Sequence, residues 1–104
     1  MLMKIIHKHK LSCQGELVTL RLPADCVLRT VEYLSQEKEV FLWVEVPARI
    51  NPDLEDRSFR IFKTGDGIPE AHQYVGTAID QYIPEAYHVY EKTVHEKTLT
   101  EQMK

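Results

Sequence analysis

Apolar and polar residues alternate with a period of two along most of the chain, which predicts β-strands. The clearest case is Val18–Leu22, where apolar residues alternate with Thr19 and Arg21. Comparable segments predict six further strands, at residues 3–11, 27–34, 40–46, 58–64, 73–79 and 86–91. We therefore predict a mainly β fold, a small, mostly antiparallel sandwich or open barrel of about seven strands.

The segment VFLWVEV, Val40–Val46, departs from this alternation because most of its residues are apolar. Apolar residues on both faces are typical of a central strand that is covered on both sides. We therefore place Trp43 in the core.

The last twelve residues show a different pattern. Thr93 and Glu96 have the T-x-x-E spacing of a helix capping box, and His95, Leu99 and Met103 follow at intervals of four. We divide the chain into a β domain, residues 1–92, and a short C-terminal helical tail, residues 93–104. A helix this short needs a surface to pack on, so we predict a homo-oligomer, a dimer, with the tail near its interface.

Composition excludes several functions. Thirteen Lys and Arg against sixteen Asp and Glu give a net charge of −3, which argues against nucleic-acid binding driven by a basic surface. The N-terminus has no signal-peptide pattern, and no apolar run is long enough to span a bilayer. We expect a cytoplasmic protein in which Cys13 and Cys26 are free thiols, with no cofactor.

A glycine-containing segment, Thr64-Gly65-Asp66-Gly67, ends the strand that carries Arg60. Its spacing fits neither common phosphate-binding glycine loop, and no substantial helix follows. We interpret the glycines as positive-φ turn residues. The alternative is an anion nest of backbone N–H groups assisted by Arg60. Arg57 and Arg60, three residues apart on a strand, are predicted to point to opposite faces.

The histidines suggest two kinds of site. His7 and His9 share one face of a strand and could form half of a zinc site, with His72, His88 or Glu91 as further ligands. The simpler interpretation is that both rings pack at a sheet edge, so we predict no metal. His88 would need a nucleophile and an orienting carboxylate to act as a general base. No motif supplies them, and we predict no enzyme activity.

Four of the tyrosines fall in the last third of the chain. Tyrosine is enriched in recognition surfaces because its ring is rigid and apolar and its tip is polar. Core packing explains some of these residues, and we predict that the others contribute to partner binding. They are Tyr74, Tyr82, Tyr87 and Tyr90.

Several motifs in order resemble a family of small phage and prophage proteins of unknown function. They are MKIIHKHKL, VFLWVEV, SFRIFKTGDGI, QYVGT and YHVYE, and the likeness covers residues 3 to about 92. The resemblance implies a compact β domain made by a bacteriophage and acting in the host cytoplasm. His7 and His9 stand where the family more often has bulky residues, and the tail at 93–104 runs beyond the likeness.

These observations favour a non-enzymatic phage accessory protein that binds a host protein, such as a defence or regulatory factor. The alternative is an oligomeric small-ligand binder, for instance a sponge for a nucleotide signal. It would use Arg60, the turn Thr64–Gly67 and a stacking tyrosine.

Overall fold

The computed structural model describes residues 3–93, and all regular structure in that range is β-strand. Six predicted strands agree with the structure to within one residue at each end. The fifth begins four residues earlier than predicted, because residues 54–57 pair with a neighbouring strand although their side chains do not alternate in character. The strands are β1 Lys4–Leu11, β2 Val18–Pro23, β3 Val27–Leu34, β4 Glu39–Pro47, β5 Leu54–Lys63, β6 His72–Asp80 and β7 Glu85–Lys92.

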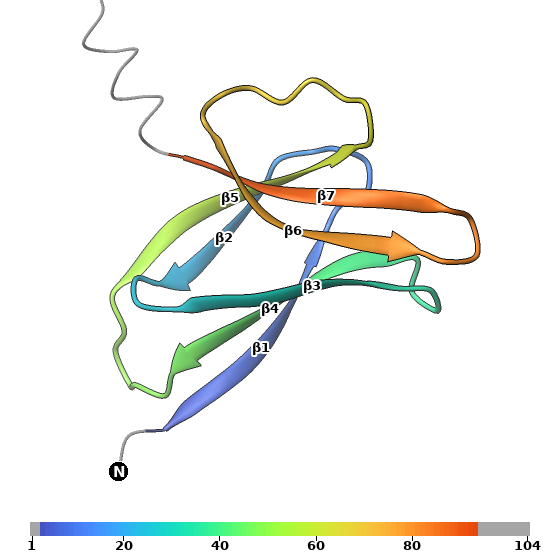
Figure 1. The fold of residues 1–104 in the computed structure, drawn as a ribbon. Helices are drawn as coiled ribbons and strands as arrows, with labels where there is room; N and C mark the ends of the chain where they lie inside the picture. The colour runs from blue at the N-terminus through green and yellow to red at the C-terminus, as the bar shows by residue number, and fades with distance from the viewer. Residues whose placement is uncertain (1–2, 94–104) are drawn as a thin grey trace, which may run out of the picture.

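The seven strands form two antiparallel sheets, which confirms the predicted mainly β class (Figure 1). The strand order is β1-β4-β3 in one sheet and β2-β5-β7-β6 in the other. No backbone pairing joins the two sheets within residues 3–93, so the arrangement is a two-layer sandwich.

The core lies between the sheets and takes alternate residues from each strand. On β4, Val40, Leu42 and Val44 are fully buried and face the second sheet, where Phe59 and Val89 are equally buried. Burying each such side chain stabilises the fold by about 1.5–3 kcal/mol. The cluster consists of Leu11, Leu22, Val31, Val40, Leu42, Val44, Val46, Phe59, Ile61, Ala78 and Val89.

In the described part of the chain, the opposite face of β4 is covered by side chains of its own sheet. The ammonium of Lys8 lies over the rings of Phe41 and Trp43, 4.7 and 5.7 Å from their centroids. Phe41 is buried, but Trp43 is only half-buried, and its indole nitrogen donates to Glu32 at 3.3 Å. The prediction of a central strand is therefore right. The placement of Trp43 in the core is wrong, because among residues 3–93 its side of the sheet is covered only by neighbouring side chains and Trp43 stays half-buried.

The connection between β5 and β6, residues 64–71, crosses the four-stranded sheet. Both strands pair with β7, which lies between them, so they run parallel and the chain must return over β7 to start β6. Figure 1 shows this connection above β7, on the side away from the three-stranded sheet. We call this side the outer face of the four-stranded sheet.

Two sequence predictions concern the ends of the chain. The predicted helix falls mainly on residues 94–104, which lie outside the described residues. Thr93 itself is described, and its backbone N–H donates to the carbonyl of Ala71 at 2.9 Å. Between residues 3 and 93 the structure contains no helix long and apolar enough to cross a membrane.

Candidate functional site

Exposed apolar side chains gather along β6 and in the turn that follows it. The exposed fractions are 55% for Tyr74, 60% for Ile79, 83% for Tyr82 and 70% for Ile83. We call these four residues the β6 surface. β6 is also an edge strand of its sheet, so its outer backbone groups have no strand partner among the described residues.

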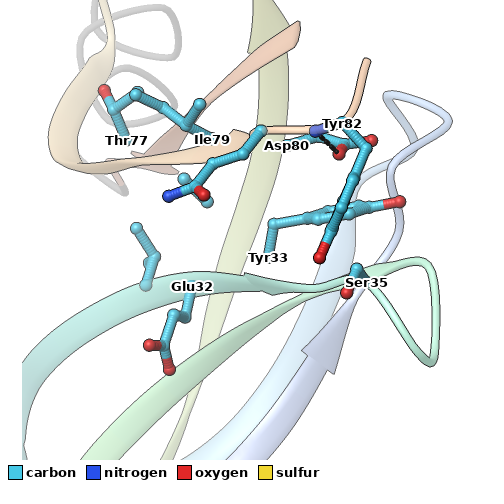
Figure 2. A pocket seen from close by; sticks show the side chains of 10 residues that line it. Glu32, Tyr33, Ser35, Thr77, Ile79, Asp80 and Tyr82 are labelled. Carbon is cyan, nitrogen blue, oxygen red and sulfur yellow. Dashed lines mark hydrogen bonds between the residues drawn. The ribbon is translucent and has the colours of Figure 1, made fainter. Parts of the chain in front are cut away.

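A groove of about 430 Å³ runs beside this surface, between β3 and β6 (Figure 2). Figure 2 shows Thr77, Ile79 and Tyr82 on the β6 side, with Tyr33 and Ser35 on the β3 side. The carboxylate of Glu32 points away from the groove, consistent with its hydrogen bond to Trp43. Ordinary pockets for small organic ligands are more apolar, so the groove is better suited to contacts along the margin of a larger interface.

Asp80 fixes the position of the β6 surface. It is buried, and its Oδ1 accepts hydrogen bonds from the backbone N–H groups of Tyr82 at 3.0 Å and Ile83 at 3.4 Å. These bonds hold the turn that presents both exposed side chains. Burial raises the pKa of the nearby Tyr33 hydroxyl, and the Asp80 carboxylate raises this pKa further.

The four predicted partner-binding tyrosines do not form one patch. Tyr82 projects from the turn, while Tyr74 and Tyr90 are paired across strands on the outer face, with ring centroids 5.5 Å apart. Tyr87 points inward and stacks on Tyr33 at 5.5 Å. Tyr87 therefore packs between the sheets, and Tyr74 and Tyr82 are the tyrosines most accessible to a partner.

The glycine segment forms a turn at the end of β5. The N–H of Asp66 donates to the carbonyl of Lys63 at 2.9 Å, and the Asp66 carboxylate accepts from the N–H of Lys63 at 2.8 Å. Gly65 has a φ of 97°, which only glycine adopts readily, whereas Gly67 does not have a positive φ. The positive-φ prediction is right for Gly65 and wrong for Gly67. The Asp66 carboxylate also places negative charge in the turn.

A chain of hydrogen bonds connects this turn to β6. His88 bonds the hydroxyl of Thr64 through Nε2 at 2.8 Å and that of Thr77 through Nδ1 at 3.0 Å. The Thr77 hydroxyl in turn contacts the hydroxyl of Tyr74 at 2.6 Å. The chain thereby links the start of the crossing connection to both β7 and β6.

This geometry brings a hydroxyl and an imidazole together, and within residues 3–93 no carboxylate bonds the imidazole. In a hydrolase triad the second imidazole nitrogen bonds a carboxylate, which stabilises the imidazolium formed during reaction. At His88 that position is taken by the neutral hydroxyl of Thr77. The arrangement is suited to fixing the connection on the sheet.

Arg57 and Arg60 point to opposite faces of β5, as predicted from their spacing. Arg57 faces inward and forms a two-pronged ion pair with Glu91, with distances of 2.6 and 2.7 Å. It also donates to the sulfur of Cys26 at 3.3 Å. Arg60 is on the outer face, opposite Tyr90. Cys26 and Cys13 are both free thiols, and burial raises the pKa of Cys13.

His7 and His9 share a face of the edge strand β1, with ring centroids 6.3 Å apart. No group of three or more potential metal ligands is found among residues 3–93. The Nε2 atom of His9 is buried and has no hydrogen-bond partner in the described part of the chain. Burial, followed by the neighbouring His7, lowers the pKa of His9.

Sequence reasoning missed several residues of these surfaces. Ile79 and Ile83 lie within three residues of Tyr82 in the sequence. Apolar residues beside a polar turn could have indicated exposed apolar side chains at this place. Thr77 carried no such signal, and His72 was considered only as a further zinc ligand. Their neighbours come from β5 and β7, which no local pattern could identify.

Comparisons with known proteins identify the family. Neither the search of curated proteins nor the search of solved structures found a match. A family model described as a domain of unknown function, DUF7352, matches residues 3–100. The match extends past residue 92, so most of the tail lies within the family pattern, contrary to the sequence prediction. The chain belongs to this DUF7352 family.

Proposed function

We propose that this domain is a non-enzymatic phage accessory protein that binds a host protein, a defence or regulatory factor of the infected cell. The observation that carries the proposal is the β6 surface. Single exposed apolar residues are common in soluble proteins, whereas grouped ones mark interaction sites. Here four large side chains, each more than half exposed, occur within ten residues.

The turn after β6 is well suited to recognition. Asp80 and the paired strands β6 and β7 hold Tyr82 and Ile83 in place, so binding orders little additional chain. The groove beside the turn offers hydroxyl and carboxylate groups as a polar border around the apolar centre. The phage origin and the host cytoplasm as the site of action are supported by the motif resemblance alone.

Affinity capture from host lysate tests the proposal when variants are compared. The test variant combines Tyr82→Ser and Ile83→Ser, and the control is Ile50→Ser, which alters a side chain that is 95% exposed and lies outside the β6 surface. We expect one host protein to be retained by the wild type and by the control but lost with the double variant. Equal retention by all three proteins would exclude the β6 surface as the binding site.

A small-ligand binder built on the turn Thr64–Gly67 is the alternative. The described contacts favour it less, because the Thr64 hydroxyl is bonded to His88 and the Asp66 carboxylate to backbone. A thermal-shift panel of nucleotides separates the two functions, since a ligand that binds the native state raises the melting temperature.

We also propose that the protein self-associates as a dimer. Met3, just before edge strand β1, and Ile5 and Ile6 at its start are exposed, and a second copy would cover them. Light scattering on the full chain tests whether a dimer forms, and light scattering on a variant ending at Lys92 tests whether the tail contributes to it. A monomeric full chain refutes the dimer, and an unchanged dimer after truncation refutes a role for the tail.

A further inference from the structure

We propose that the outer face of the four-stranded sheet binds a nucleoside monophosphate, with Arg60 contacting the phosphate and Tyr74 stacking on the base. This site lies across β5, β7 and β6 and is distinct from the glycine turn. The site shares Tyr74 with the β6 surface, but the inference does not depend on the proposed host-protein function.

The charge of Arg60 is the first observation. The chain has five arginines, and Arg21, Arg29, Arg49 and Arg57 each form an ion pair with a carboxylate. Arg60 forms none within residues 3–93, although it is only half-exposed, and its buried Nε has no hydrogen-bond partner there. A partly buried guanidinium without a carboxylate is a suitable partner for phosphate, which it recognises through paired N–H donors.

Strand register places aromatic rings beside this charge. Arg60 and Tyr74 are both cross-strand partners of Tyr90, one on each side. Directly opposed side chains on a sheet lie about 5 Å apart, so the three form a row across the sheet. Tyr74 is the exposed end of this row and meets Tyr90 edge-to-face, which leaves ring surface for a base. Stacking of a base on an aromatic side chain contributes about 1–3 kcal/mol.

The next row adds a second cation, Lys92, beside an imidazole whose nitrogens are unsatisfied. Lys92 is the cross-strand partner of His72 and forms no ion pair within the described range. Both ring nitrogens of His72 are buried without a hydrogen-bond partner. Three of the four such nitrogen atoms found between residues 3 and 93 therefore lie on this face, on Arg60 and His72. Unsatisfied buried polar atoms are rare in native proteins, and a bound ligand is one way of satisfying them.

Three carboxylates lie on or near the outer face, those of Asp56 on β5 and of Asp66 and Glu70 on the crossing connection. Asp56 is paired with Arg21, and Asp66 is hydrogen-bonded to the N–H of Lys63. The hydrogen bond between Thr64 and His88 fixes the crossing connection beside the row. The attraction for an anion therefore comes from Arg60 and Lys92, which form no ion pair within residues 3–93.

The test is to titrate the full chain with the four nucleoside monophosphates, with adenosine and with inorganic phosphate. Binding is measured from changes in the NMR chemical shifts of the backbone amides. We expect at least one nucleotide to shift amides of β5, β6 and β7 around Arg60, Tyr74 and Tyr90. We expect adenosine and inorganic phosphate each to bind about tenfold more weakly or worse, because each retains half of the contacts. Absence of shifts with every nucleotide at millimolar concentration would overturn the proposal.

Variants assign the contacts. We expect Arg60→Gln to weaken nucleotide binding about tenfold or more, and Tyr74→Ala to weaken nucleotide but not phosphate binding. The matched control is Arg21→Gln, which removes an ion-paired arginine from the same face and should leave binding unchanged. If Arg60→Gln does not fold, Arg60→Lys replaces it as the test variant, because it keeps the charge but loses the paired N–H donors. Unaltered affinity in the Arg60 variant that folds, or equal affinity for phosphate and nucleotide, would refute the assigned roles.

Discussion

Gly76 on β6 lies directly against Val31 on β3, and this contact sets how closely the edges of the two sheets approach. A Cβ atom added at Gly76 would lie 2.9 Å from Cγ2 of Val31, well inside van der Waals contact. The backbone of β6 thus packs on a core side chain of the other sheet. The groove beside the β6 surface is bordered by both strands, so its width depends on this pair.

Replacing Gly76 with alanine should therefore destabilise the domain. Overpacking of this kind costs about 1–3 kcal/mol, measurable as a lower free energy of unfolding in urea. The matched control is Gly67→Ala, which places a Cβ in open space. We expect Val31→Ala to offset part of the loss in a double variant. Independent, additive effects of the two substitutions would contradict the contact.

The two glycines of the turn after β5 should respond differently to substitution. Gly65→Val forces a β-branched residue into a φ of 97° and should cost about 1–3 kcal/mol of stability. Gly67→Val should have little effect, because Gly67 has no positive φ and a Cβ added there meets no atom of residues 3–93 within 4 Å. Thermal unfolding of both variants measures the difference. Equal losses of stability in the two variants would contradict the backbone conformation described for this turn.

Stability should fall with acidification in a way that depends on His9. Burial, and secondarily His7, lowers the pKa of His9 in the folded state. The unfolded chain, with a histidine pKa of about 6.5, then binds protons more readily, so protonation favours unfolding. Neutral His9 contributes its full share of stability above the unfolded-state pKa of about 6.5. That stability is lost as the pH falls towards the lower pKa of the folded state.

The measurement for His9 is the melting temperature at about pH 7.5 and pH 5. We expect His9→Gln to reduce the loss between these two pH values relative to the wild type. Lys10→Gln, on the opposite face of β1, is the control and should retain the wild-type dependence. A His9→Gln variant with an undiminished pH dependence would assign the effect to other groups.

The ion pair between Arg57 and Glu91 should be important for stability because both side chains are about four-fifths buried. Removing one partner leaves the other charge poorly solvated, so Glu91→Gln and Arg57→Met should each cost about 1–3 kcal/mol. The double variant should be less destabilised than the sum of the two, as a double-mutant cycle measures. Strict additivity would mean that the pair does not act as a unit.

The sequence determined where the strands lie and which side chains share a face. Alternation is a local property, because successive side chains on a strand point to opposite sides. It therefore placed six strands to within a residue, separated Arg57 from Arg60, and marked β4 as central. The turn at Gly65 was equally local, since it depends on backbone conformation at one residue.

Only the tertiary structure decided which strands meet. Pairing is set by burial over the whole domain and by the path of the connections, neither of which is encoded in a short window. The crossing of residues 64–71 over β7 brings Thr64 to His88, and the order β5-β7-β6 aligns Arg60 with Tyr90 and Tyr74. The same long-range packing left Trp43 half-buried although its own strand is apolar on both sides, because the two sheets that residues 3–93 form place no further layer over Trp43.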